Sequence, residues 1–228
     1  MDKISIIIPT LNEDKNLPFV FADILRVMDN SNYPWFEIIV VDGGSSDRTV
    51  EVAERFGARI IEHRGGKGSA LRRGWNEAKG DIIITMDADC SNVAEELLML
   101  INGIKNGFDI CMGSRFMEGG NSEDISLIRK IGNKFFVSMV NLFWKTNYTD
   151  LCYGYRSFHR DCIPRLKTRT NGFGIETEIS ILAAKNKLKV TEVPSFEKKR
   201  RHGKGKLRTI KDGFNILMTI IRELIRKE

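Results

Sequence analysis

The chain has 228 residues and a net charge of +6, with 42% hydrophobic and 29% charged residues, which suits one α/β domain with or without an appendage. The charge is uneven: from residue 196 onward there are eleven Lys or Arg against four Asp or Glu, so the first 195 residues sum to −1. This excludes a uniformly basic protein. It indicates either an anionic partner for the C-terminal segment or a solvated charged helix face.

The cysteines and the N-terminus indicate the compartment. The four cysteines form no CxxC pair, and the three histidines show no zinc-ligand spacing, so we expect free thiols in a reducing compartment. The N-terminus lacks the pattern of a signal peptide, and the longest apolar candidate, residues 135–144, is about half of the ~18–20 residues that span a bilayer. We therefore expect a cytoplasmic protein, or one bound peripherally to the cytosolic face of a membrane.

The first half of the chain alternates strands and helices. Apolar runs predict strands at 4–8, 36–41, 58–62, 82–84 and 108–112. Helical spacing predicts helices at 17–28, from Ser45 or Ser46 to 56, from 65–68 to 78, and at 93–105. This repeat, at roughly 20–25 residues, predicts a doubly wound, mostly parallel α/β sheet.

Polar residues follow the carboxyl ends of these strands. They are Asn12 and Glu13, Asp42, Lys67, Asp87 and Asp89, and Arg115. In open α/β sheets, ligands bind outside the carboxyl ends of the strands. The sequence therefore predicts a single site at this edge.

The pair Asp87 and Asp89 is the centre of that prediction. In extended chain, residues two positions apart point to the same side, so the two carboxylates would project together from the strand. Such a pair suits a hard divalent ion, Mg²⁺ or Mn²⁺, which binds carboxylates together with substrate phosphates. The plain alternative is a helix cap, but Ser91 and Asn92 can cap the next helix alone.

The second half departs from the simple alternation. We expect a polar loop at 117–126, a helix at 128–143, a strand at 154–158, a helix from 172–174 to 185 and a strand at 188–193. Residues 197–208 are densely basic, and residues 210–225 form an amphipathic helix with an apolar stripe. That helix fits a membrane interface and packing on its own domain about equally well.

Other phosphate and nucleic-acid motifs are absent from the sequence. Ile61 stands where a P-loop ending at Lys67 needs glycine, and no GxGxxG follows the first strand. The basic segment lacks interleaved stacking aromatics, so we expect no nucleic-acid partner.

Together these motifs resemble family 2 glycosyltransferases with the GT-A nucleotide-diphospho-sugar fold, of the dolichyl- or polyprenyl-phosphate mannose synthase type. The resemblance rests on segments that occur in the family's order: 8–13 (IPTLNE), 41–47 (VDGGSSD), 67–70 (KGSA), 87–89 (DAD), 113–115 (GSR), 149–150 (TD), 154–156 (GYR) and the basic segment ending at 205–207 (GKL). It implies domain boundaries of 1–206 for the transferase domain, with a nucleotide-binding half at 1–115 and an acceptor half at 116–206. Residues 207–228 would form a separate basic amphipathic helix.

The resemblance also implies roles for individual residues. The nucleotide would be bound by Pro9, Thr10, Asn12, Glu13, Asp42, Lys67, Asp87 and Ala88, and Mg²⁺ or Mn²⁺ by Asp87 and Asp89. Phosphates of the donor or the lipid acceptor would be bound by Arg115, Arg129, Arg200, Arg201 and Lys206. Two positions depart from the family pattern, because Gly43 replaces a second acid and Ser91 replaces a glutamine near the metal.

The implied reaction is an inverting transfer of a hexose from GDP-mannose or a UDP-sugar to a polyprenyl or dolichyl phosphate, with an anionic membrane surface as a further partner. Asp89, Asp150 and Arg115 would be catalytic. A lipid phosphate is already anionic and needs no strong base, whereas a sugar hydroxyl acceptor requires a carboxylate, with Asp150 as first candidate and Glu176 or Glu178 after it. The alternatives are such a hydroxyl-directed transferase and a non-catalytic membrane-docking module. Donor identity and oligomeric state stay open.

Overall fold

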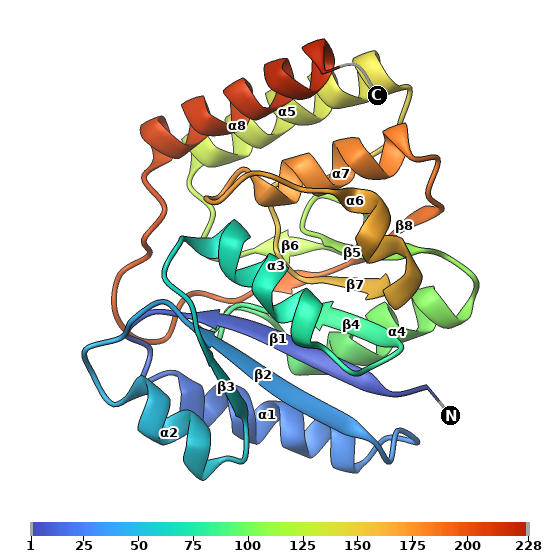
Figure 1. The fold of residues 1–228 in the computed structure, drawn as a ribbon. Helices are drawn as coiled ribbons and strands as arrows, with labels where there is room; N and C mark the ends of the chain where they lie inside the picture. The colour runs from blue at the N-terminus through green and yellow to red at the C-terminus, as the bar shows by residue number, and fades with distance from the viewer. Residues whose placement is uncertain (1, 227–228) are drawn as a thin grey trace.

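A central seven-stranded sheet forms the middle of the computed structural model, which describes residues 2–226 (Figure 1). Runs of β-branched residues such as 4–8 and 38–41 form its central strands. Along the chain its strands are β1 (Ile4–Thr10), β2 (Phe36–Asp42), β3 (Arg59–Glu62), β4 (Ile82–Thr85), β5 (Ile110–Ser114), β7 (Arg156–His159) and β8 (Val190–Pro194). Their order in the sheet is β3-β2-β1-β4-β7-β5-β8. The predicted mostly parallel α/β sheet is confirmed.

Strand β7 is the exception, because it runs antiparallel to both of its neighbours, β4 and β5. Arg156 at its start is 1% exposed. Its guanidinium donates to the carbonyl oxygens of Leu151, Tyr153 and Glu176. The reversal brings the residues just before β7 to the edge where the parallel strands end.

The alternation of side chains along the strands gives the sheet two separate cores. On one face, Ile6 and Ile8 pack with α1 (Leu17–Asp29), α2 (Thr49–Arg55), the short helix η1 (Ala94–Glu96) and α4 (Leu97–Lys105). On the other face, Ile7 packs with α3 (Lys67–Glu77) and α7 (Ile175–Lys185). Two short helices, η2 (Arg160–Cys162) and α6 (Ile163–Leu166), connect β7 to this second layer.

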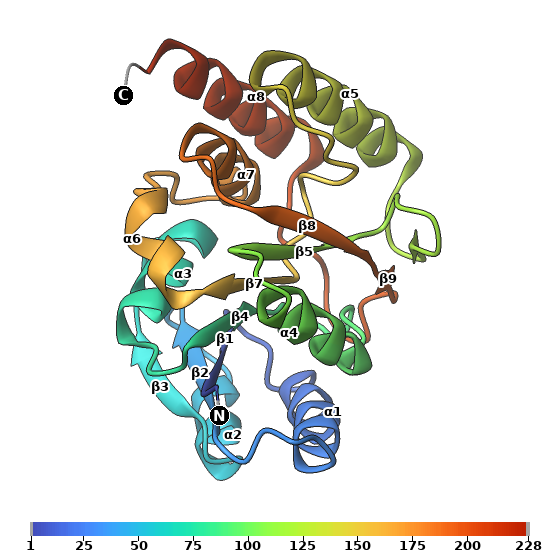
Figure 2. The same cartoon turned by 90° about the vertical axis from the view of Figure 1, so that its right-hand side faces the viewer.

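A further layer lies outside α7. It consists of α5 (Leu127–Trp144) and α8 (Thr209–Ile225), which lie side by side (Figure 2). Ile216 and Ile220 of α8 are buried, whereas Ile210 and Phe214 on the same helix are exposed. Helix α8 therefore packs on its own domain with one side and presents a second apolar side outward.

The expected basic character of the last helix is not found in α8 itself. Its two cations, Lys211 and Arg222, are balanced by Asp212 and Glu223. The positive charge belongs to the preceding segment, residues 198–208, which follows the two-residue strand β9 (Phe196–Glu197). Strand β9 pairs in parallel with β6 (Asn121–Ser122), which lies in the predicted polar loop.

Two helix starts differ from the prediction because their expected capping residues bond elsewhere. Helix α2 begins at Thr49, and the Ser45 hydroxyl donates to Asp42 instead of capping it. Asn92 accepts the backbone N–H of Asp87, and the backbone N–H of Ser91 donates to Asp89. Residues 45–46 and 91–92 thus shape the turns at the sheet edge.

The described residues bear on two further expectations. Cys90, Cys111, Cys152 and Cys162 are all free thiols, as predicted. Between residues 2 and 226, none of the helices combines the length and the apolar character needed to cross a bilayer.

Candidate active site

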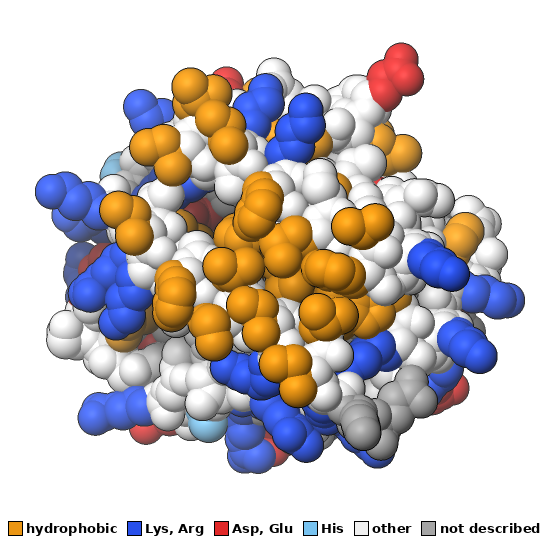
Figure 3. Space-filling view, turned by 90° about the horizontal axis from the view of Figure 1, so that it is seen from above, with side chains coloured by type: hydrophobic (Ala, Val, Ile, Leu, Met, Phe, Trp, Pro, Cys, Tyr) orange, Lys and Arg blue, Asp and Glu red, His pale blue; other side chains and the backbone are white. Residues whose placement is uncertain are grey.

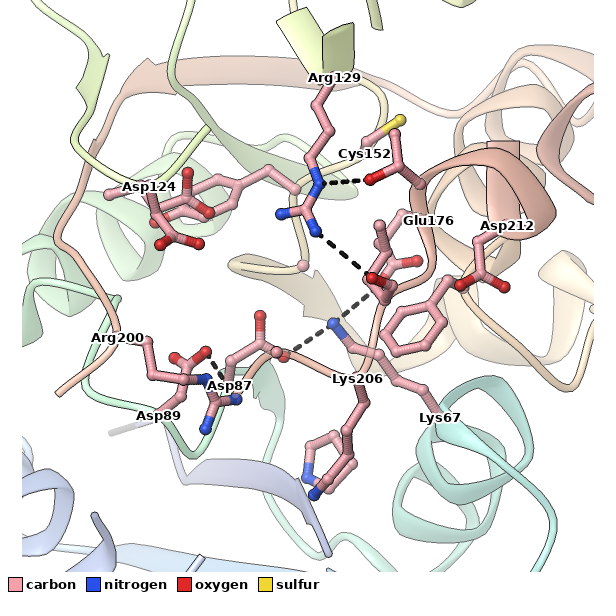
Figure 4. Close-up of a pocket in the computed structure, with 18 of the residues that line it drawn as sticks. Lys67, Asp87, Asp89, Asp124, Arg129, Cys152, Glu176, Arg200, Lys206 and Asp212 are labelled. Atoms are coloured by element: carbon pink, nitrogen blue, oxygen red, sulfur yellow. Dashed lines mark hydrogen bonds and ion pairs between the residues drawn. The ribbon is translucent and has the colours of Figure 1, made fainter. Parts of the chain in front are cut away.

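A cavity of about 520 Å³ lies at the carboxyl edge of the parallel strands (Figure 4). Turns that follow β1 to β5 line one part of it, and the segment before β7 lines the same part. The basic segment 198–208 and the helices α5, α7 and α8 complete the wall. The convergence predicted from the strand ends is therefore present.

Asp87 is held by a buried lysine. Lys67 Nζ lies 2.7 Å from Asp87 Oδ1 and 2.9 Å from Glu176 Oε1. Burial alone lowers the pKa of Lys67, but the charges and hydrogen bonds of Asp87 and Glu176 outweigh it and raise that pKa above its usual value. Lys67 therefore forms a buried ion pair with both Asp87 and Glu176.

Asp89 is held by an arginine from the basic segment. Arg200 Nη2 lies 3.0 Å from Asp89 Oδ2, and Arg200 Nη1 lies 2.9 Å from Glu13 Oε2. Burial and the charge of Asp87 raise the pKa of Asp89, while Ser91 and Arg200 oppose that shift. The backbone N–H of Arg201 also donates to the Asp89 carbonyl oxygen. Both a side chain and the backbone of the basic segment 198–208 therefore bind Asp89.

Asp87 and Asp89 both line the cavity, as predicted, but the backbone that brings them there is not the extended chain on which the prediction was based. Strand β4 ends at Thr85, so Asp87 and Asp89 lie in the turn after it and not in extended chain. The turn is fixed by the side chain of Asn92, which accepts the Asp87 N–H at 2.8 Å, and Cys90 within it has a φ of 67°.

A divalent ion fits this donor set. Carboxylate oxygens are the ligands that Mg²⁺ and Mn²⁺ favour, and such ions are often held by one or two carboxylates plus substrate phosphates. Among residues 2–226, no group of three or more His, Cys, Asp or Glu side chains is arranged as a metal site. The remaining ligands would have to come from a bound diphosphate and water.

The residues predicted to bind the nucleotide fall into two groups. Pro9, Thr10, Glu13, Lys67, Asp87 and Ala88 line the cavity. Asp42 and Asn12 do not belong to its lining. Asp42 accepts the backbone N–H groups of Gly44 and Ser45 at 2.9 Å, and Asn12 accepts that of Ser46 at 2.8 Å. These two residues organise the turns beside the cavity, and their contact with a nucleotide stays a prediction.

Arg115 and Asp150 form a buried pair. Arg115 Nε and Nη2 donate to the two Asp150 oxygens at 2.7 and 3.0 Å, and Arg115 Nη1 donates to Glu197 at 3.1 Å. Asp150 is 0% exposed, and Arg115 but not Asp150 lines the cavity. This geometry does not favour Asp150 as a base, because both its oxygens are occupied and an acceptor hydroxyl has no route to them.

Glu176 and Glu178 face different surroundings, as their spacing on a helix predicts. Glu176 lines the cavity beside Lys67. Glu178 is completely buried and accepts the backbone N–H groups of Arg169 and Thr170. Only Glu176 is placed to contact a ligand.

The remaining predicted cations are also divided. Arg129 lines the cavity, where its Nε donates to Thr209 Oγ1 at 3.3 Å and its Nη2 to the Leu207 carbonyl oxygen at 3.4 Å. Lys206 lines it as well, with Nζ 3.5 Å from Glu13 Oε1. Arg201 instead stacks on Phe19, 3.5 Å from the ring centroid, and does not line the cavity.

Several lining residues were not predicted from the sequence: Asp124, Cys152, Phe173, Glu197 and Asp212. Glu197 had a recognisable signal, because it is an isolated acid directly before four consecutive cations. The others carry no local pattern that marks them.

Comparisons with known proteins agree with one another. Residues 5–166 match the family model described as glycosyl transferase family 2. The dolichol-phosphate mannosyltransferase of Pyrococcus furiosus is 36% identical over 214 residues, which cover 90% of this chain and 59% of that protein. The dolichyl-phosphate hexose transferase of Haloferax volcanii is 28% identical over 222 residues, which cover 97% of this chain and 93% of that protein.

A solved structure supports the fold alone. The glucosyl-3-phosphoglycerate synthase of Mycobacterium tuberculosis, crystallised with Mn²⁺, uridine diphosphate and phosphoglyceric acid, superposes with a TM-score of 0.74 at 19% identity. The superposition covers 100% of this chain and 80% of that one.

Proposed function

The chain belongs to glycosyl transferase family 2, and from this premise we propose that it transfers a hexose, with inversion, from a nucleotide-diphospho-sugar to a polyprenyl phosphate. It is a glycosyltransferase with the GT-A fold. One observation carries the proposal: a single cavity joins a pair of carboxylates and several cations to the apolar helices α5 and α8. A donor with a diphosphate and an acceptor with a lipid tail both match that composition.

The donor would bind at the end of the cavity that holds the acids. Asp87 and Asp89 would hold a divalent ion, Mg²⁺ or Mn²⁺, which would supply electrostatic stabilisation for the diphosphate that leaves. Lys67 and Arg200 now neutralise these acids. With a metal ion bound to Asp87 and Asp89, the side chains of Lys67 and Arg200 would become available to bind the phosphates. Pro9 and Thr10 would contact the base and the ribose.

The acceptor would be positioned by arginines and not activated by a base. A phosphate monoester is anionic near neutral pH, and inversion follows from its direct attack on the anomeric carbon. Arg115, Arg129 and Lys206 line the cavity and can hold that phosphate. The burial of Asp150 agrees with a reaction that needs no carboxylate at that position. If the acceptor were a sugar hydroxyl, Glu176 would be the acid within reach of the cavity.

The outer layer would meet a membrane. Large apolar side chains gather on one face, with Lys and Arg around them (Figure 3). They belong to α5 and α8: Leu127, Ile128, Ile131, Phe135, Leu142, Phe143, Ile210, Phe214, Met218, Leu224 and Ile225. An apolar surface bordered by cations suits the interface of an anionic bilayer. We therefore propose peripheral binding to the cytosolic face, with residues 1–115 for the donor and 116–206 for the acceptor. Residues 207–228 would bind the membrane together with the exposed apolar side of α5.

Incubation with labelled nucleotide sugars tests the activity. GDP-mannose, UDP-glucose and other donors are each supplied with Mn²⁺ and a polyprenyl phosphate in detergent, and lipid-extracted label is measured. We expect a glycolipid whose anomeric configuration is inverted in its NMR spectrum. Asp87→Asn and Asp89→Asn should abolish it, whereas Asp161→Asn, at an exposed acid near the opposite end of β4, should not. A lack of glycolipid with every donor would refute the proposal.

Vesicle sedimentation tests the membrane surface separately. The double variant Ile210→Ser, Phe214→Ser should lose binding to anionic vesicles, and Met99→Ser, at an exposed apolar residue on α4, should keep it. Equal binding by both variants would remove the membrane role of α8. Binding without any transfer would instead favour the non-catalytic docking module.

A further inference from the structure

Two glycines inside helices contribute to the wall of the cavity. Gly132 lies in α5 and Gly213 in α8, and both line the cavity. Neither has a left-handed φ, and a Cβ added at either would meet no atom within 4 Å. Glycine destabilises a helix interior relative to alanine. Neither backbone conformation nor close packing therefore explains glycine at these positions.

The glycines lie where the cavity reaches the apolar face. Ile128 and Phe136 of α5 and Ile216 of α8 line the same cavity, together with Leu207 just before α8. Ile128 is 70% exposed and also lines the cavity, so the cavity opens to the surface beside it. The open space beside Gly132 and Gly213 thus belongs to an apolar slot whose walls come from α5 and α8.

The inner end of the slot is cationic. Arg129 reaches across it to Thr209 and to the Leu207 carbonyl oxygen (Figure 4). Arg115 and Lys206 line the cavity beyond it. An occupant that matches the slot is apolar along its length and anionic at its inner end. A free phosphate would leave the apolar walls in contact with water, so the complementarity favours a phosphate that carries a hydrocarbon chain.

We propose that Gly132 and Gly213 keep this slot open for the isoprenyl units next to the acceptor phosphate, and that they limit how bulky those units can be. This rests on the proposed function, since it assigns the path of the same acceptor. The glycines act as specificity-determining residues. They do not contact the reacting atoms.

Substitution with a large apolar side chain tests the slot. Gly132→Leu and Gly213→Leu fill it. Lys134→Met, at an exposed residue of α5 that does not line the cavity, is the matched control. The kcat/KM is measured with detergent-solubilised polyprenyl phosphate, and donor affinity is measured by thermal shift. We expect the leucine variants to lose at least about tenfold in kcat/KM, as a filled pocket does, and Lys134→Met less than about threefold. Donor affinity should stay within about twofold for all three.

The outcomes separate this inference from the proposed function. Folded leucine variants that transfer at the parental rate would overturn the slot while leaving the activity intact. A leucine variant that loses donor affinity to the same extent would overturn it as well, because the effect would then not be specific to the acceptor. If the parent protein transfers sugar to no lipid phosphate, the proposed function itself fails.

A second measurement is independent of turnover and of the leucine variants. Gly132→Cys places a thiol in the slot, and its alkylation by a maleimide is followed with and without ligands. Citronellyl phosphate and polyprenyl phosphate should protect the thiol at least about threefold, and inorganic phosphate should not. Equal alkylation rates under all conditions, or equal protection by inorganic phosphate, would contradict a hydrocarbon-binding slot.

Discussion

Replacement of Asp150 by asparagine is the sharpest test of how the site is built. The substitution keeps the shape of the side chain and removes its charge. Asp150 accepts hydrogen bonds from Arg115 Nε at 2.7 Å and Nη2 at 3.0 Å, and from the backbone N–H of Cys152 at 3.1 Å. In the variant, one of these oxygens becomes an amide group that faces a guanidinium, and Arg115 keeps its charge inside the protein.

The expected cost follows from burial. Removing one partner of a buried ion pair destabilises a protein by about 3–5 kcal/mol. Glu197 still accepts from Arg115 Nη1 at 3.1 Å, so part of the guanidinium charge stays compensated. We therefore expect the low end of the range, about 3 kcal/mol in the free energy of unfolding.

Urea unfolding at pH 7 measures this change, with the slope of the transition unchanged. Asp124→Asn, at an exposed acid on the cavity wall, is the control and should stay within about 0.5 kcal/mol of the parent. The pH profile of kcat/KM should keep its shape in Asp150→Asn. A variant as stable as the parent that has lost turnover would refute this reasoning and restore Asp150 as a base.

Three further predictions concern charges. Arg200→Gln should raise the affinity of the nucleotide-free protein for Mn²⁺ several-fold in calorimetry, because the ion no longer competes with a guanidinium for Asp89. Weaker binding of Mn²⁺ would show that Arg200 favours metal binding instead of competing with it. Burial raises the pKa of Cys90 to about 11 and that of Cys162 to about 12. At pH 8 the thiols of the folded protein should therefore react with iodoacetamide far more slowly than those of the protein unfolded in urea. Equal alkylation rates in the two states would contradict this. Burial also raises the pKa of Glu192, so the folded protein holds that proton to higher pH than the unfolded chain does, and stability falls as pH rises through the raised pKa. Glu192→Gln should flatten that fall in urea midpoints between pH 4 and 7, and an unchanged slope would exclude Glu192 as its cause.

Much of the fold could be predicted because the pattern of the first half is local. Runs such as Ile4–Ile8 and Ile82–Ile84 favour buried strands whatever surrounds them. The carboxyl ends of parallel strands meet at one edge, so Glu13, Lys67, Asp87 and Asp89 could be placed together from the sequence alone. The direction of β7 could not be predicted, because a four-residue strand reads the same in a parallel or an antiparallel ladder.

The partners of the site residues were beyond the sequence for a similar reason. Nothing near Asp150 indicates that Arg115, 35 positions earlier, occupies both of its oxygens. Arg200 and Arg201 are neighbours in the basic segment, yet one points to the acids and the other stacks on Phe19. Such pairings depend on how distant segments pack, and no local period encodes them.

The reversed strand β7 has a consequence for how the polypeptide acquires its structure during synthesis. Residues 156–159 are inserted between β4 and β5, so these two strands cannot join the same ladder until the ribosome has made the later segment. A nascent chain that stops at residue 115 would carry an unpaired edge on β4, which invites association with other chains. We therefore expect residues 1–115 to mature only together with the segment that follows them, and to aggregate when expressed alone.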